Sequence, residues 1–477
     1  MFWKFLLILI LVFIGFLVYR ACKFVPEKKE ALEKTEVDLD FDQAISNFSE
    51  IIKIPTVSHT DGVGEDEEVF DKMLDSIKSF YPRVFEQTTF EKVGRRGFLF
   101  HWKGQKETNP SVFMAHYDVV PVDEAKWTFD PFSGQIKDGY LFGRGTLDTK
   151  GTFVAVLETA EKLLKEGFVP EDDIYLAFSG EEEPHGPSAD LIAQKIHSKN
   201  HEVKFVLDEG GAVVENIFPG TDNRIAVIGI GEKGVMDLKL KVGGKGGHAS
   251  QPPAKSLVGK LSKGLVNIEN HPMPIHLNPP FVELIDKVGR YASLPIRIVL
   301  ANLKIFKPIL NLAGKKLGGE LNALMRTSFA LTTLEGSKQI NVMPPSVEAG
   351  INIRCLKEDS KDDILDHIKK VSKIENLDLE VPFYEPASNY SKTDVDGYKL
   401  LEKSINETWE DAIVSPYLMI AASDSRHYSK FSDRVYRFSA MEMTKEERGL
   451  IHGEDEKIRL EEWKNTLRFY YRIMKRM

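Results

Sequence analysis

The sequence predicts an α/β protein in which a sheet with helices on both faces is interrupted by a smaller α+β unit, behind an apolar N-terminal helix. Three observations predict this class. Apolar strand-like runs alternate with amphipathic helical stretches after residue 41, a strand–helix–strand–strand–helix–strand order occupies residues 235–382, and the first twenty residues are almost wholly apolar. The predicted boundaries divide the chain into residues 1–25, 26–40, 41–230, 231–385 and 386–477.

The N-terminal segment has no charge over residues 5–19, between Lys4 and Arg20. Counted from Met1, it is just long enough for a tilted helix across a bilayer. A cleaved signal peptide needs a small-residue cleavage site, and Tyr19-Arg20-Ala21-Cys22 is a poor one, while Arg20 argues against a lipoprotein cysteine at Cys22. Polar residues after the segment also disfavour a buried core helix. We therefore expect an uncleaved single-span anchor, whose orientation the flanking basic residues leave open.

The first part of the main unit follows a charged spacer at residues 26–40. A helix is expected over 41–53, because Pro55 disfavours its continuation. Four strands are expected over residues 97–102, 111–115, 174–178 and 203–207, and a further helix is expected over residues 152–166. In such sheets, ligand-binding side chains cluster just past the carboxyl ends of strands.

The second part of the pattern has the order of a small βαββαβ sandwich, which is a ferredoxin-like arrangement. Its elements are expected over residues 235–242, 255–269, 326–334, 346–355, 361–374 and 377–382. Residues 270–325, with several prolines and two apolar helical runs, form a predicted insertion into this unit. The first pattern returns near residue 386 and ends in a long helix at 456–475.

Composition limits the chemistry of the chain. Its 63 Lys+Arg against 72 Asp+Glu give a net charge of −9, so no general phosphate-binding or nucleic-acid surface is indicated. Only Cys22 and Cys355 are present, which excludes a disulfide framework and a thiolate zinc cluster. Any metal must therefore be held by histidines and carboxylates.

Four strand ends carry such residues. The acidic or imidazole side chains concerned are His116 and Asp118, Asp148 in a glycine-rich loop, the run Glu181–Glu183, and Asp208 with Glu209. The glycine spacing around Asp148 matches neither a P-loop nor a dinucleotide fingerprint. Adjacent carboxylates repel one another unless solvent or a cation neutralises them. Side chains converging from four strand ends without thiolates suit zinc or a similar divalent ion, and two metals sharing one carboxylate fit the set.

The motifs then establish a resemblance. They are M-A-H-Y-D-V-V-P-V, W-x-F-D-P-F-S-G, G-R-G-T-L-D-T-K-G, S-G-E-E-E, F-V-L-D-E-G-G, G-G-H-A-S, N-V-M-P-P-S-V-E-A-G-I-N-I-R and S-D-S-R-H-Y. From about residue 41 to its end, the chain resembles the two-zinc metallopeptidases that include carboxypeptidase S, Gly-X carboxypeptidases, aminoacylases, acetylornithine deacetylase and succinyl-diaminopimelate desuccinylase. It is most similar to the carboxypeptidase S branch.

The resemblance implies two zinc ions, with cobalt or manganese as substitutes. The implied metal ligands are His116, Asp148, Glu183, Asp208 and His452. Asp148 would bridge both ions, Asp118 would orient His116, and Glu182 would be the general base. Because Glu181 stands where the family usually has Asp, the register of the run Glu181–Glu183 is open by one residue.

Three further residues carry implied substrate contacts. His248 would help to hold the oxyanion, in its own or the other subunit's site. Asn341 and Arg354 fall in the stretch that holds the substrate's free carboxylate, for which a guanidinium fork is well suited. The resemblance also implies that the inserted unit is a lid and dimerisation domain, so a homodimer is expected.

The expected function is therefore that of a membrane-tethered zinc hydrolase that cleaves an amide next to a free carboxylate, in short peptides or N-acyl amino acids. The extracytoplasmic side is favoured by the resemblance. Two alternatives remain: a deacylase of one small metabolite, and an inactive dimeric binding protein.

Overall fold

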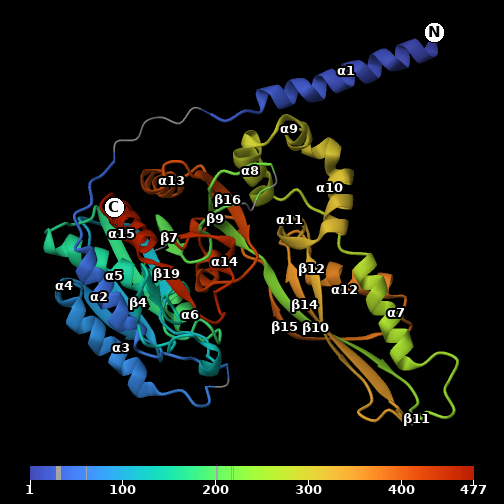
Figure 1. The fold of residues 1–477 in the computed structure, drawn as a ribbon, viewed down its shortest axis with the longest axis horizontal. Coiled ribbons are helices and arrows are strands. Elements are labelled where there is room, and N and C mark those ends of the chain that lie inside the picture. Colours follow the sequence, from blue (N-terminus) through green and yellow to red (C-terminus); the bar gives the residue numbers. More distant parts are fainter. Residues whose placement is uncertain (28–33, 61, 200–201, 216–217, 219) are drawn as a thin grey trace.

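The computed structural model describes residues 1–477 except 28–33, 61, 200–201, 216–217 and 219. The predicted charged spacer therefore lies partly outside the described residues. Figure 1 shows a body built on a large sheet, a smaller sheet beside it, and the N-terminal helix projecting from the pair.

The larger sheet contains ten strands in the order β1-β2-β6-β3-β7-β17-β9-β8-β18, with β16 also paired to β9. Strands β3, β6 and β7 run parallel, so their carboxyl ends meet at one edge. The strands are β1 (Thr89–Val93), β2 (Gly97–Trp102), β3 (Lys106–His116), β6 (Asp172–Ser179), β7 (Phe205–Asp208), β8 (Val213–Val214), β9 (Ile225–Glu232), β16 (Ile413–Met419), β17 (Val435–Arg437) and β18 (Glu442–Met443).

Both faces of this sheet are covered, as predicted. Along β3, Phe113 and Ala115 belong to one core cluster, whereas Val112 and Met114 belong to another on the opposite face. Each fully buried large apolar side chain contributes about 1.5–3 kcal/mol. The first cluster includes side chains of α2 (Phe41–Ile52), α3 (Glu67–Phe80), α4 (Pro82–Gln87), α5 (Lys150–Lys165), α13 (Asp396–Thr408) and α15 (Leu460–Met474), and the second includes side chains of α6 (Ser188–Lys199) and the 3₁₀ helix η3 (Asp424–Lys430).

A small peripheral sheet and two short helices complete this body. The sheet has the order β19 (Lys457–Arg459), β5 (Tyr140–Phe142) and β4 (Ile136–Lys137). The short helices are the 3₁₀ helix η1 (Glu124–Lys126) and α14 (Lys445–Arg448).

The smaller unit has the predicted βαββαβ order and a core of its own. Its antiparallel sheet has the order β12 (Ser328–Glu335), β14 (Ser346–Cys355), β10 (Gly234–Gly243) and β15 (Asp378–Glu385). Apolar side chains of α7 (Leu257–Asn270) and α12 (Lys361–Ser372) pack on it. Because β10 starts two residues after β9 ends, the sheet begins beside the main body and extends away from it. A two-stranded pair, β11 (Gly247–His248) and β13 (Val342–Met343), lies at its distal end (Figure 1).

Most of the insertion at residues 270–325 packs on the main body, although Met273 joins the core of the smaller sheet. It forms α8 (Pro279–Val288), the 3₁₀ helix η2 (Gly289–Tyr291), α9 (Leu294–Leu300), α10 (Leu303–Leu317) and α11 (Gly319–Met325). Phe281, Leu284 and Ile285 of α8 join the core of the larger sheet, against β16.

The N-terminal helix α1 (Phe2–Lys23) contacts α9, and only its residues Leu17 and Ala21 are buried. By length and composition it is apolar enough to cross a membrane, a property that signal sequences share.

Candidate metal centre

The predicted ligands come together where the parallel strands end. His116 is the last residue of β3, the acidic run follows β6, and Glu209 follows β7. Asp148 lies in the glycine-rich loop immediately before α5. Because neighbouring parallel strands end at one edge, residues distant in sequence converge there.

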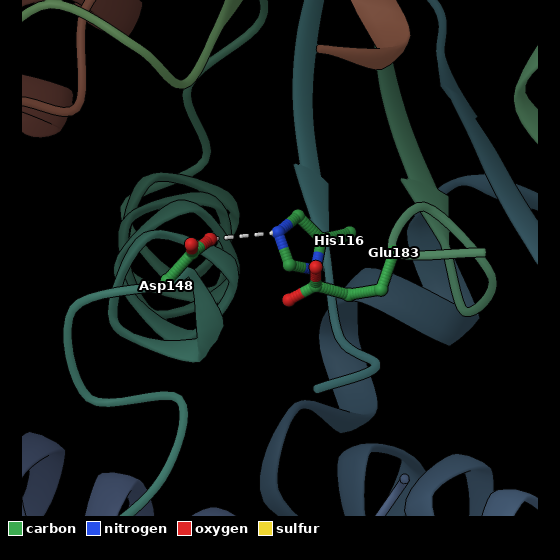
Figure 2. A group of neighbouring side chains, drawn as sticks. All are labelled: His116, Asp148 and Glu183. Atoms are coloured by element: carbon green, nitrogen blue, oxygen red, sulfur yellow. Dashed lines mark hydrogen bonds and ion pairs between the residues drawn. The ribbon is translucent and has the colours of Figure 1, made fainter. Parts of the chain in front are cut away.

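Asp148 lies between two imidazoles. Its Oδ1 is 3.0 Å from His116 Nε2, and its Oδ2 is 3.0 Å from His452 Nε2. His452 Nε2 is also 3.3 Å from Glu183 Oε1. Figure 2 shows His116, Asp148 and Glu183 pointing toward one another. Within each of two groups, His116–Asp148–Glu183 and His116–Glu182–Glu209, the donor atoms all lie within 4.8 Å of one another.

Asp118 holds both the His116 ring and the acidic run. His116 Nδ1 lies 3.0 Å from the Asp118 carbonyl oxygen and 3.4 Å from its Oδ1, which leaves Nε2 facing Asp148. The backbone amide of Glu182 donates to Asp118 Oδ1 (3.1 Å), and that of Glu183 donates to Oδ2 (3.2 Å). Ser58 Oγ donates to Oδ2 as well (2.6 Å). Such a carboxylate fixes the ring orientation that a metal-binding imidazole requires.

The three carboxylates of the acidic run face different partners. Glu181 turns away from the ligand groups, because its Oε1 accepts hydrogen bonds from the backbone amide (2.8 Å) and hydroxyl of Ser188. Glu182 and Glu183 are the two that belong to the ligand groups. Glu181 therefore lies outside the ligand groups, and the division of base and ligand between Glu182 and Glu183 stays a prediction.

Asp208 and Glu209 differ in where they point. Asp208 Oδ2 accepts a hydrogen bond from the Ser425 amide (2.9 Å), and Asp208 belongs to neither ligand group. The next residue, Glu209, has its Oε2 3.5 Å from His116 Nε2. Asp208 therefore stays a prediction as the fifth ligand. Glu209 is a further candidate for that role, which the sequence did not single out. Neighbouring residues of a strand point to opposite faces, and this alternation could have indicated Glu209 as a candidate beside Asp208.

The raised pKa values of the buried site residues indicate that the site is suited to a cation. Burial lowers the pKa of His116, but the charge of Glu209 and hydrogen bonds to Asp118 and Asp148 outweigh it and raise that pKa well above its usual value. Burial raises the pKa of Glu209 to about 8 and that of Asp424 to about 7, and it also raises the pKa of Glu182. Carboxylates this close retain protons unless a cation neutralises them.

The donor set fits a divalent metal ion. Glu183 Oε1 is buried, and its partner among the described residues is the imidazole of His452 at 3.3 Å, itself a predicted ligand, so the atom is available to a metal ion. The other donors are imidazole nitrogens and carboxylate oxygens, which suit zinc and related divalent ions. His427, a second histidine of the C-terminal part, instead pairs with Asp190 at 2.9 Å.

A buried carboxylate from the C-terminal part of the chain supports the Asp148 loop. Glu456 pairs with Arg144 (2.7 Å) and accepts hydrogen bonds from the backbone amides of Gly145, Leu147 and Asp148. No motif in the sequence pointed to this role. The pairing ties the two parts of the main body together at the Asp148 loop.

The predicted substrate residues separate into two places. Arg354 lies at the end of β14 next to the main body, opposite Val235. Burial, with the charges of Arg426 and Arg354, lowers the pKa of His185, which follows the acidic run. Arg354 therefore lies on the side of the ligand groups.

His248 and Asn341 lie instead at the distal end of the smaller sheet (Figure 1). The amide of Ala249 donates to the Asn341 carbonyl (3.1 Å), so the two segments are paired. His248 is exposed, with its Nδ1 2.8 Å from Ser250 Oγ. Within one chain, these two residues are not brought to the ligand groups.

Known proteins are similar to this chain in sequence. The sequence pattern of peptidase family M20/M25/M40 matches residues 112–476. "Probable carboxypeptidase S-like 2" of Dictyostelium discoideum is 35% identical over 453 residues, covering 92% of this chain and 85% of the relative. "N-fatty-acyl-amino acid synthase/hydrolase PM20D1" of Mus musculus is 31% identical over 431 residues, covering 89% of this chain and 85% of the relative.

Solved structures share the fold at low identity. An M20 family metallo-carboxypeptidase from Sulfolobus solfataricus aligns with a TM-score of 0.66 at 17% identity, over 91% of this chain and 98% of that chain. The Bacillus subtilis YXEP protein, described as a dinuclear metal binding peptidase from the M20 family, aligns with a TM-score of 0.57 at 12% identity, over 91% and 97%.

Proposed function

The chain belongs to peptidase family M20/M25/M40, and on that premise we propose that it is a two-zinc hydrolase of amide bonds next to a free carboxylate. The observation that carries the proposal is the position of Asp148 between His116 and His452, with Glu182 and Glu183 beside them. The substrates would be short peptides or N-acyl amino acids, because the relatives are described as carboxypeptidase S-like proteins and as an N-fatty-acyl-amino acid synthase/hydrolase.

The residues divide the work of hydrolysis. His116, Asp148, Glu183 and His452, with Asp208 or Glu209, would hold the metals. When bound, the two ions would lower the pKa of the attacking water and polarise the substrate carbonyl. Glu182 takes a proton from that water at its carboxylate and passes it to the departing amide nitrogen. The Glu182 backbone is held by the hydrogen bond that its amide N–H donates to Asp118, which also orients His116.

Recognition of the free carboxylate is assigned to Arg354. It approaches the main body from the smaller sheet, beside His185 and Arg426. A guanidinium group binds a carboxylate through two parallel hydrogen bonds, which an ammonium group cannot do.

A substrate panel tests this assignment. Wild-type chain is expected to hydrolyse N-acyl amino acids and dipeptides, and to discriminate against their C-terminal methylamides. Arg354→Gln should raise KM for the free acids by roughly 10²-fold, because a charge-assisted hydrogen bond contributes about 1.5–3 kcal/mol, and should leave the methylamides unchanged. Lys357→Gln, on the exposed turn after β14, is the matched control. Equal losses on acids and methylamides would contradict a carboxylate contact, and turnover of a single small metabolite would favour the deacylase alternative.

We further propose that two copies form a homodimer through the smaller unit. His248 and Asn341 lie at its distal end, where a second copy would have to supply the site that they serve. Mixing His248→Ala with Glu182→Gln chains should then restore activity, since one site of the mixed dimer has both residues intact. A mixture no more active than its components would place His248 outside the partner's site.

We also propose that α1 is retained as an anchor. Its 22 residues suffice to span a bilayer, and it remains attached to α9 through Leu17 and Ala21. Alkaline extraction should leave the intact chain in the membrane pellet. A shortened chain in the supernatant would identify the segment as a cleaved signal sequence.

A further inference from the structure

Helix α10 presents an apolar face to solvent. Ile305, Ile309 and Leu312 are spaced so that they lie on one side of the helix, and they are 42%, 57% and 56% exposed. We call these three residues the α10 face. Leu303 and Leu310 of the same helix pack against the core of the main body. The α10 face is therefore directed away from the protein, where a soluble surface helix would carry polar residues.

The surrounding segment is strongly basic. Residues 291–319 contain no Asp or Glu, in a chain whose net charge is −9. The five basic residues in this segment are Arg297, Lys304, Lys307, Lys315 and Lys316. All four lysines are exposed, and none forms an ion pair among the described residues. An apolar stripe flanked by unpaired lysines is the pattern of a helix that lies in a membrane interface.

The start of α10 is next to the apolar N-terminal helix. Asn302, at the start of α10, donates its Nδ2 to the carbonyl oxygen of Leu17 in α1 (3.3 Å). Arg297 of α9 donates to the carbonyl oxygen of Phe24 (3.4 Å), just after α1. Side chains of α1 and α10, among them Arg20 and Ile305, line one cavity of about 460 Å³. Figure 1 shows α10 crosswise to α1 at the same end of the molecule, as an interfacial helix beside a spanning helix would lie.

From these observations we infer that α9 and α10 dock on the surface of a bilayer that carries anionic headgroups. The α10 face enters the interface, and the four lysines contact the headgroups. A second copy of this chain is the less favourable occupant, because it would bring a second set of unpaired lysines against the first. Docking by two elements fixes the orientation of the body on the membrane, which a single helix and a linker would leave free.

The test measures where the α10 face lies in the full chain. A nitroxide is attached at Ile309→Cys in a Cys22→Ser background. Cys355 stays unlabelled because it is buried, and burial raises the pKa of its thiol to about 12. The protein is inserted into preformed vesicles of phosphatidylcholine and phosphatidylserine. Collision rates of the label with oxygen and with a water-soluble nickel chelate are measured by electron paramagnetic resonance. Ile136→Cys, 48% exposed on β4, is the matched control.

Docking predicts frequent oxygen collisions and severalfold fewer nickel collisions at position 309 than at position 136. Equal nickel collisions at the two positions would overturn the inference. Low collision rates with both reagents, together with spin–spin broadening, would also overturn it, because they would show a second copy covering the face.

Charge-reversal variants and uncharged vesicles measure how much the lysines contribute to docking. The double substitution Lys304→Glu/Lys315→Glu should raise nickel collisions at position 309 severalfold, as should vesicles made of phosphatidylcholine alone. Lys72→Glu/Lys78→Glu, on the exposed side of α3, should leave them unchanged. Nickel collisions that are low and insensitive to both changes would contradict a surface that requires anionic headgroups.

Discussion

The Glu182→Gln variant is expected to lose roughly 10²–10⁴-fold in kcat while keeping the metal content of the wild-type chain. That range is typical of a positioned general base. Glu182 is buried beside the ligand groups, and its backbone amide is held by Asp118. Glutamine keeps the size of the side chain and removes only its ability to accept the proton. Steady-state kinetics and elemental analysis on the same sample measure both quantities.

The neighbouring residue provides the control. Glu181→Gln disturbs the hydrogen bonds to Ser188, so it should lower the free energy of unfolding by about 1–3 kcal/mol and leave kcat near the wild-type value. If Glu181→Gln abolished turnover and Glu182→Gln did not, the base would lie one residue earlier. A loss of metal in Glu182→Gln would instead make Glu182 a ligand, in the group that it forms with His116 and Glu209.

Asp148→Ala is expected to lower kcat more than about 10³-fold. The proposed metal ions would lower the barrier by several kcal/mol, and each 1.36 kcal/mol corresponds to a tenfold change in rate. Asp148 is within 3.0 Å of both His116 and His452, so in the proposed two-metal site its loss would remove a ligand from both ions. Elemental analysis should find the metal content of this variant strongly reduced.

The surface substitution Asp123→Ala is the control for Asp148→Ala, since Asp123 pairs only with exposed Lys126 in the described part of the chain. It should keep both metal and turnover. An Asp148→Ala chain with full metal content would show that this carboxylate is not a bridging ligand.

Much of the fold could be predicted from the sequence because its apolar runs are long and regular. The strand expected at 97–102 matches β2, and the smaller unit has the expected βαββαβ order of elements along the chain. The strand expected at 203–207 is displaced to Phe205–Asp208, because an apolar run does not mark where ladder hydrogen bonds begin.

The packing of the insertion at residues 270–325 could not be predicted from the sequence. The amphipathic pattern of α8 predicts a helix with one buried face but does not say which sheet receives it. Phe281 and Leu284 pack against the main body although the chain enters and leaves through the smaller unit. Long-range pairing of this kind leaves no local signal, and neither does the contact of Glu456 with the Asp148 loop.

Some of the site residues could likewise be found from local sequence patterns, and others could not. His116, Asp148 and the acidic run were visible as polar residues at strand ends, and His452 was identified only through the family resemblance. The choice between Asp208 and Glu209 depends on which face of the strand end meets His116, and adjacent carboxylates look alike in sequence. His248 and Asn341 lie away from the ligand groups within one chain, and their contribution to a second chain's site stays a prediction.

The most direct test of the two-zinc hydrolase is the metal content of the full chain, purified without chelators, measured alongside hydrolysis of an N-acyl amino acid. We predict two equivalents of zinc per chain, loss of turnover when chelation removes them, and recovery when zinc is restored. Full turnover in a metal-free chain would contradict the proposed chemistry, and a chain with neither metal nor turnover would be the inactive binding protein.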